Sequence, residues 1–161
     1  MFYIEKRFTL PIGHRLSKHK GRCFSIHGHN FTILIGVKAS KLNENDMVID
    51  FSDLKAVVSG FLDNLDHCLL LNKNKDEELL ELLQKMNMRT TGVDFDPTAE
   101  RLSHEIYKYV KITLEKMYKD VLMDYVTVFE NENSKATYRE VPRGGRSLTS
   151  KTNLSGETGP G

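Results

Sequence analysis

Residues 23–37 read Cys23-Phe24-Ser25-Ile26-His27-Gly28-His29-Asn30-Phe31-Thr32-Ile33-Leu34-Ile35-Gly36-Val37. From Phe31 onward a large apolar residue occupies every second position, which is typical of a strand with one buried face. His27 and His29 lie at the mouth of this strand. They are two residues apart, so an extended backbone directs both side chains to the same face. With His14 upstream, the region places three imidazoles and one thiol within sixteen residues.

The three histidines predict a metal site. His14 completes a three-nitrogen set if its segment runs alongside that of His27 and His29. Three protein ligands that leave a fourth position open are typical of catalytic zinc, whereas structural zinc sites are usually closed by four protein ligands. Cys23 would then be a reactive thiol beside the open position. The alternative interpretation is a group of solvated loop histidines.

The rest of the chain predicts an α+β domain. Residues 2–9 alternate as a strand that Pro11-Ile12-Gly13 is expected to end, and this strand should pair antiparallel with residues 31–37. The polar, basic residues 15–22 form the expected loop between them. Helical spacing of apolar residues predicts helices over 52–65, with Ser52 as its cap, over 76–88, and from Pro97 and Thr98 to Met117.

The last of these helices is expected to face inward through Leu102, Ile106, Tyr109, Val110, Thr113 and Met117. Residues 87–96 read as a loop before it. Strands over 125–130 and 135–140 then close the domain, so the order is two strands, helices and two strands. Residues 1–141 form the expected domain. Residues 142–161, with almost no apolar content, are expected to form a flexible C-terminal tail.

The composition excludes several classes of protein. The chain has 161 residues, a net charge of +1, 28% charged and 39% hydrophobic residues. This balance gives no reason to expect nucleic acid or a membrane as a partner. The apolar runs are too short to span a bilayer, and the N-terminus does not read as a signal peptide, so a cytoplasmic protein is expected.

The two cysteines have different surroundings. Cys68 lies among leucines and reads as a small buried hydrophobic residue. A single disulfide with Cys23 is conceivable, but a reducing cytosol fits better with a metal and thiol site.

Five motifs, in order, make residues 2–140 resemble the superfamily of 6-pyruvoyl-tetrahydropterin and 6-carboxytetrahydropterin synthases. They are Gly13-His14-Arg15-Leu16, Cys23 through His29, Ile49-Asp50-Phe51, Leu65-Asp66-His67 and Pro97-Thr98-Ala99-Glu100, with Glu130 as a weaker sixth. The resemblance implies the tunnelling fold (ββααββ), with an antiparallel four-stranded sheet and helices on one face. Three subunits would close a β-barrel, and two trimers would stack into a homohexamer, with active sites between subunits.

The resemblance also implies a role for each matching residue. His14, His27 and His29 would bind Zn2+, and Cys23 would act as the general base. Asp66 and His67 would form a carboxylate–imidazole pair that shuttles a proton. Glu130 would anchor the pterin, because a carboxylate accepts from the two N–H donors of its amino-pyrimidine edge, and Thr98 and Glu100 would line the rest of that pocket.

Plainer interpretations stand beside these roles. Asp66 and His67 are also a possible ion pair at a helix end, Glu130 a possible exposed carboxylate, and Thr98 and Glu100 ordinary helix-start residues. Asp50 is more simply a structural turn residue. His19 and His104 match no motif and read as surface histidines. The basic loop, made of Arg15, Lys18, His19, Lys20 and Arg22, either attracts a substrate triphosphate or is merely solvated.

The spacing C-x-x-x-H-G-H resembles the bacterial 6-carboxytetrahydropterin synthases, lyases on the route to queuosine. It implies conversion of 7,8-dihydroneopterin triphosphate to 6-carboxy-5,6,7,8-tetrahydropterin, with release of acetaldehyde and triphosphate. The alternatives are the pyruvoyl synthase reaction and, in a different class, a non-catalytic zinc-stabilised binding protein in which Cys23 is the fourth ligand. Two features depart from the family: residues 73–96 form an extra segment, and Asn131 replaces a usual Thr.

Overall fold

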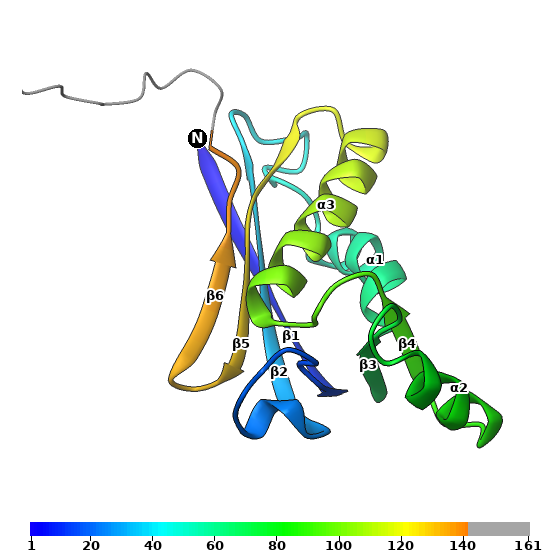
Figure 1. The fold of residues 1–161 in the computed structure, drawn as a ribbon. Coiled ribbons are helices and arrows are strands. Elements are labelled where there is room, and N and C mark those ends of the chain that lie inside the picture. Colours follow the sequence, from blue (N-terminus) through cyan, green and yellow to red (C-terminus); the bar gives the residue numbers. More distant parts are fainter. Residues whose placement is uncertain (142–161) are drawn as a thin grey trace, which may run out of the picture.

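The computed structural model describes residues 1–141, and the tail predicted for residues 142–161 lies outside them. The elements follow one another along the chain as drawn in Figure 1. The strands are β1 (Phe2–His14), β2 (His27–Ala39), β3 (Cys68–Asn72), β4 (Thr90–Val93), β5 (Val121–Asn131) and β6 (Ser134–Tyr138). The helices are α1 (Phe51–Leu62), α2 (Glu77–Lys85) and α3 (Ala99–Met117), and a short 3₁₀ helix, η1, covers Arg22–Phe24.

The sheet corrects the expected architecture. The α+β class is confirmed, but the described residues form a six-stranded mixed sheet in the order β4-β3-β1-β2-β5-β6. The predicted strands β1, β2, β5 and β6 pair antiparallel as expected. Residues 68–72, to which the prediction gave no element, form β3, which pairs parallel with β1. The predicted loop over 87–96 contains β4, which pairs parallel with β3.

The first strand is longer than predicted because Pro11 does not end it. Pro11 lies opposite Asn30 of β2, and β1 continues to His14. The carbonyl oxygen of Pro11 accepts a hydrogen bond from the backbone N–H of His67, at 2.9 Å. The carbonyl and nitrogen of one strand residue point to the same side, so the Pro11 nitrogen faces away from β2 and costs that pairing no hydrogen bond.

Helices α1 and α3 cover one face of the sheet (Figure 1). Alternate residues of β2 are buried beneath them, namely Phe31, Ile33, Ile35 and Val37. Each such side chain contributes about 1.5–3 kcal/mol when it leaves water. The opposite face of β1 carries the exposed residues Tyr3, Glu5, Arg7 and Thr9. The predicted placement of helices on one face is therefore observed for α1 and α3, whereas α2 contacts the edge strand β4.

The helix ends and faces differ in detail from the prediction. Helix α1 is capped by Asp50, whose carboxylate accepts from the Ser52 backbone N–H, so Ser52 is not the cap. Asp50 is thus a structural residue, as its plainer interpretation held. Thr98, predicted at the start of the last helix, is the cap of α3. The buried face of α3 includes Tyr107 and Leu114, whereas Met117, placed inward by the prediction, is 60% exposed.

Part of the sheet edge is open in a single chain. Only Ile12–His14 of β1 pair with β3, and among the described residues the other side of Phe2–Leu10 has no strand partner. Strand β6 forms the far edge. Free edges of this kind favour further strand pairing.

None of the helices between residues 1 and 141 is long and apolar enough to cross a membrane.

Candidate metal centre and active site

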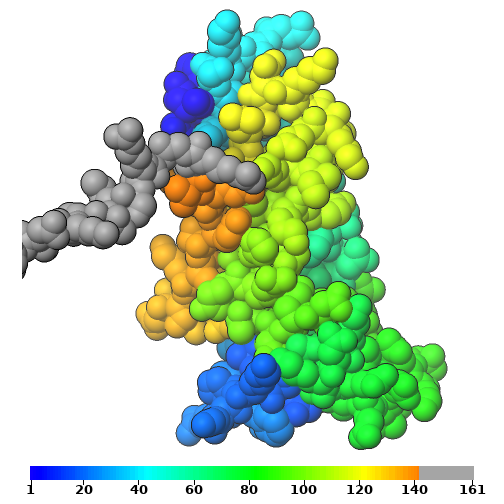
Figure 2. All heavy atoms as spheres, turned by 45° about the horizontal axis from the view of Figure 1, so that its top comes forward, coloured from blue at the N-terminus to red at the C-terminus, as the bar shows by residue number. Residues whose placement is uncertain are grey.

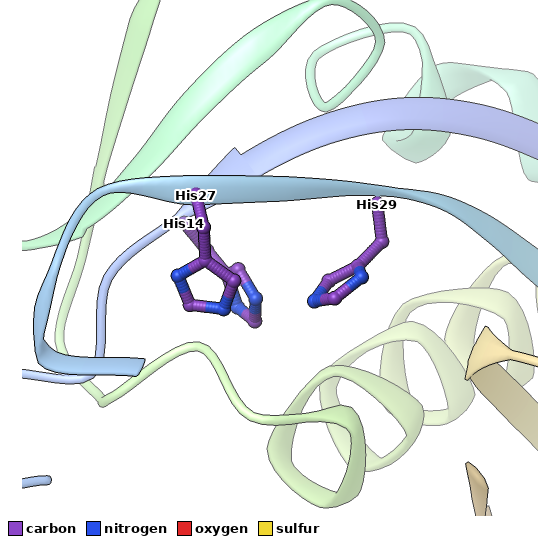
Figure 3. A group of neighbouring side chains, drawn as sticks. All are labelled: His14, His27 and His29. Atoms are coloured by element: carbon purple, nitrogen blue, oxygen red, sulfur yellow. The ribbon is translucent and has the colours of Figure 1, made fainter. Parts of the chain in front are cut away.

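Strands β1 and β2 bring the three histidines together at one end of their hairpin. The register places His14 opposite His27, and Ile12 opposite His29. One ligand nitrogen from each histidine can be chosen so that all three lie within 4.8 Å of one another. Figure 3 shows the three rings on the same side of the two strands. The shared face of His27 and His29, and the position of His14 alongside them, agree with the sequence prediction.

Backbone carbonyls fix the tautomers of two of these rings. His14 Nδ1 lies 2.8 Å from the carbonyl oxygen of Pro97, and His27 Nδ1 lies 2.8 Å from that of Ser25. A carbonyl oxygen only accepts, so each Nδ1 carries the proton and each Nε2 presents a lone pair. His14 Nε2 is buried and has no hydrogen-bond partner among the described residues. This arrangement is typical of metal-ligating histidines.

The environment of His14 favours its neutral form. Burial lowers the pKa of His14, and the nearby imidazoles of His27 and His29 lower it further. The hydrogen bond to Pro97 and the charge of Glu130 act in the opposite direction, but the net pKa is lowered. Metal binding requires neutral imidazoles. The three residues therefore fit a zinc ion with an open coordination position.

Glu130 lies close to the histidine group. It lies near the end of β5, where the pairing with β6 is irregular between Phe129 and Asn131. Its charge acts on His14, as the pKa of that residue shows. Glu130 and His29 also line a cavity of about 550 Å³ with Asn30, Phe129 and Asn131. That size suits a small ligand.

Cys23 is half-buried on the short helix η1, in the loop that joins β1 to β2. The loop folds back on itself, because the Leu16 backbone N–H donates to the Cys23 carbonyl oxygen at 2.9 Å. In the described part of the chain, the group of side chains able to share a metal consists of the three histidines and does not include Cys23. This arrangement favours an open site over one closed by Cys23.

Asp66 and His67 form the expected pair. Their Oδ1 and Nδ1 atoms are 2.8 Å apart, and their side chains are 42% and 74% exposed. His67 has a φ of 53°, in the left-handed region. The pair stands at the start of β3 and does not belong to the histidine group of the same chain.

Arg89, which the sequence did not single out, supports this turn. It donates from Nε to the Asp66 carbonyl oxygen at 2.8 Å and from Nη2 to that of Asp63 at 2.6 Å. Both carbonyls lie more than twenty residues away in the chain. A local motif therefore gives no signal for Arg89.

Thr98 and Glu100 follow Pro97, whose backbone carbonyl contacts the proposed metal ligand His14. Thr98 caps α3 by accepting from the Arg101 backbone N–H, so it has the structural role that its plainer interpretation gave it. Glu100 is exposed in the first turn of α3. Pro97, directly before Thr98, supplies the carbonyl that holds His14. Sequence reasoning placed Pro97 only as a helix-start residue.

The basic loop divides into two kinds of residue. The Arg15 guanidinium lies 3.2 Å from the buried carboxylate of Asp76 and stacks 4.3 Å from the centre of the Phe24 ring. Lys18, His19, Lys20 and Arg22 are exposed. Arg15 is therefore engaged within the protein, whereas the other four remain available to an anionic ligand.

Comparison with known proteins gives a consistent result. The sequence profile of the family described as 6-pyruvoyl tetrahydropterin synthase matches residues 3–141. A 6-carboxy-5,6,7,8-tetrahydropterin synthase from Haemophilus influenzae is 36% identical, with 69% of this chain and 83% of that protein covered. One from Aquifex aeolicus is 30% identical, with 85% of this chain and 97% of that protein covered.

The fold has close neighbours among solved structures. The 6-pyruvoyl tetrahydropterin synthase of Caenorhabditis elegans superposes with a TM-score of 0.63 at 22% identity, over 87% of this chain and 96% of that one. At this identity the likeness concerns the fold alone, and it agrees with the match of the family profile.

Proposed function

The chain belongs to the 6-pyruvoyl tetrahydropterin synthase family, and we propose that it is a zinc-dependent lyase that forms 6-carboxy-5,6,7,8-tetrahydropterin. Its substrates would be 7,8-dihydroneopterin triphosphate and water, and the other products acetaldehyde and triphosphate. The relatives from Haemophilus influenzae and Aquifex aeolicus, which carry this name, support the choice of reaction. The observation that carries it is the group of His14, His27 and His29, with two tautomers fixed by backbone carbonyls.

These three histidines would hold the zinc through their ring nitrogens. When bound, zinc acts as a Lewis acid that polarises oxygen atoms of the substrate side chain and makes its C–H bonds easier to ionise. The Pro97 and Ser25 carbonyls keep the His14 and His27 rings oriented before any ligand arrives. Such preorganisation is typical of catalytic metal centres.

Cys23 is the proposed general base. It lies on η1, four residues before the first metal ligand of β2, and it is half-buried and not part of the metal-binding group. The thiolate is the basic form of a cysteine. Cys23 would remove a proton from the substrate side chain.

Asp66 and His67 are the proposed proton shuttle, with the carboxylate orienting the imidazole through the 2.8 Å contact. A single chain does not bring this pair into the histidine group. A site shared between subunits would resolve that separation. The free edges of β1 and β6 are compatible with trimers that close a barrel, and we propose a homohexamer built of two such trimers.

Glu130 is the proposed pterin anchor, because it lines a cavity of about 550 Å³ that also reaches His29. A carboxylate there can accept two N–H bonds from the amino-pyrimidine edge. Glu100, exposed beside the capping residue Thr98, would complete the pterin pocket with it.

We propose that the protein acts in the cytoplasm, on the route to queuosine.

Two other functions compete with this one. A 6-pyruvoyl-tetrahydropterin synthase would use the same metal and base but keep the three-carbon side chain; the name of the matching family is the observation that favours it. A non-catalytic zinc-stabilised protein would need a closed site. The open three-histidine group, without Cys23, argues against it.

Anaerobic incubation of the zinc-loaded protein with 7,8-dihydroneopterin triphosphate separates the three functions. The pterin would be analysed by mass and acetaldehyde by a coupled assay, with Cys23→Ala as the control. We expect the carboxy product and acetaldehyde, both lost in the control while zinc content is unchanged. A pyruvoyl product without acetaldehyde would support the first alternative, and no turnover by a folded, zinc-loaded protein would support the second.

A further inference from the structure

The carboxylate of Asp96 joins three separate parts of the chain. Its Oδ1 accepts from Ser17 Oγ at 2.8 Å and from Asn72 Nδ2 at 3.0 Å, and its Oδ2 accepts from Lys75 Nζ at 2.8 Å. Ser17 belongs to the loop after β1, Asn72 ends β3, and Lys75 precedes α2. Burial raises the pKa of Asp96, but the bonds from Lys75, Ser17 and Asn72 outweigh it and leave the pKa lowered. Asp96 is therefore an ionised acceptor at neutral pH.

The bond from Ser17 reaches the loop that carries Cys23. Leu16, next to Ser17, donates from its backbone N–H to the Cys23 carbonyl oxygen at 2.9 Å. Asp96 thus holds the first part of the loop at Ser17, and the neighbouring residue Leu16 in turn binds the backbone of Cys23. Figure 2 shows the blue loop and the green residues of the α2 region lying against each other.

A second contact joins the first part of this loop to the extra segment 73–96. Arg15, two residues before Ser17, pairs with Asp76 and stacks on the ring of Phe24, the neighbour of Cys23. Asp76 directly precedes α2, and Asp96 follows the end of β4. Residues 15–17 are consequently attached to the extra segment at two points.

Asp96 also lies next to the carbonyl that orients a metal ligand. The Pro97 carbonyl oxygen accepts from His14 Nδ1 at 2.8 Å. The Thr98 backbone N–H donates back to the Asp96 carbonyl oxygen at 2.8 Å, which closes a tight turn around Pro97. The carboxylate of Asp96 is therefore held one residue before the carbonyl that accepts from His14.

We propose that Asp96 is a positioning residue, which holds the Cys23 loop through Ser17 and the His14 ring through Pro97. The extra segment 73–96 would thereby set the distance between the base and the metal ligands. This inference rests on the proposed function, in which His14 is a zinc ligand and Cys23 a base.

Asp94 provides a matched control two residues away. Its side chain is 70% exposed and pairs with Lys73 at 2.7 Å, outside the network of Asp96. The test compares Asp96→Ala with Asp94→Ala for zinc affinity, by competition with a chromogenic chelator. It also compares the rate at which iodoacetamide alkylates Cys23 in the zinc-free protein, resolved from the buried Cys68 by peptide mass mapping. Circular dichroism checks that both variants are folded at the assay temperature.

We expect Asp96→Ala to weaken zinc binding about tenfold, because the Pro97 carbonyl, the outer partner of His14, would then be held less firmly. We expect Cys23 alkylation to become about fivefold faster, as one lost hydrogen bond predicts. In the active enzyme kcat should fall while KM stays close to its original value. Asp94→Ala should leave all of these unchanged. Equal zinc affinities and equal alkylation rates in the two variants would overturn the proposal.

Ser17→Ala keeps the test decisive if Asp96→Ala does not fold. It removes only the link to the loop, so alkylation should become faster while zinc affinity stays at the wild-type value; an unchanged alkylation rate would count against the proposal. Failure of the proposed function is distinguishable, because wild-type protein without synthase activity can still show the zinc and alkylation differences between Asp96→Ala and Asp94→Ala. Those differences would then establish the positioning role alone.

Discussion

Arg89 Nε donates a hydrogen bond to the carbonyl oxygen of Asp66 across 2.8 Å and 23 positions of sequence. The next residue, His67, has a φ of 53°, a conformation that costs a non-glycine residue about 1 kcal/mol or more. The surrounding structure must supply that energy. Arg89, directly before β4, ties the turn before His67 to this side of the sheet, together with the Thr91 hydroxyl of β4, which donates to the Asn64 carbonyl oxygen at 3.2 Å.

Replacing Arg89 with Met should therefore loosen the Asp66–His67 turn. We expect a loss of about 1–2 kcal/mol in the free energy of unfolding, since two hydrogen bonds to exposed carbonyls are removed. Urea denaturation of the zinc-free protein would measure it. Lys85→Met, which removes an exposed cation of α2 paired only loosely with Glu81 at 3.7 Å, is the control and should change stability little. A similar loss in both variants would contradict the role of Arg89.

If the histidine group holds zinc, as proposed, loss of one imidazole should remove it. His27→Gln should bind less than a tenth of the zinc bound by the original protein after dialysis, because three ligands are close to the minimum for a stable site. His19→Gln is the matched control, since His19 is exposed and only accepts a hydrogen bond from the Gly21 N–H. Atomic emission on the purified proteins gives the metal content. Equal zinc contents would exclude the histidine group as the site.

Acid should abolish the contribution of Asp50 to stability. Hydrogen bonds from the Ser52 hydroxyl and backbone N–H hold the pKa of Asp50 below the ordinary value of 3.8. A lowered folded-state pKa means that the stabilisation is present above the unfolded value and is lost as the pH falls through the folded one. Asp50→Asn should therefore have a lower Tm than the original protein near neutral pH.

This difference in Tm should shrink below about pH 4. Thermal unfolding of the zinc-free proteins across that range measures it. A difference that stays constant with pH would assign the effect of Asp50 to something other than its charge.

The sequence predicted the histidine group and most of α1 and α3 because these depend on local periodicity. His27 and His29 share a face through simple alternation, and Leu54, Val57 and Val58 are buried at helical spacing. The strand β3 escaped prediction because Cys68–Asn72 is a short apolar run, which periodicity alone cannot assign. Strand β4, only Thr90–Val93, exists because β3 offers it a parallel partner.

The outer contacts of the site were hidden for a different reason. Pro97 and His14 are 83 residues apart, and Ser17 and Asp96 are 79 residues apart. Their contacts depend on how α3 and the extra segment pack against the hairpin, and no motif encodes such a relationship in a single sequence. The sequence offered one signal for Asp96: it directly precedes the motif Pro97-Thr98-Ala99-Glu100.

The basic loop should separate into structural and ligand-binding residues when its charges are removed. Arg15→Gln leaves the Asp76 carboxylate, whose side chain is 1% exposed, without its cation. Loss of one partner of a buried ion pair typically costs about 3–5 kcal/mol. Arg15→Gln should therefore lower the free energy of unfolding by an amount near the lower end of that range, since Arg15 itself remains 21% exposed.

Lys18 and Lys20 should behave in the opposite way, because both are exposed and have no ion-pair partner among the described residues. Lys18→Gln combined with Lys20→Gln should leave stability within about 0.5 kcal/mol. It should raise KM for the proposed triphosphate substrate several-fold, and more strongly at low ionic strength, because the attraction is between exposed charges. Urea denaturation and steady-state kinetics at two salt concentrations test both expectations. If the double variant keeps its KM at low salt, then the loop is merely solvated, and the triphosphate is bound elsewhere.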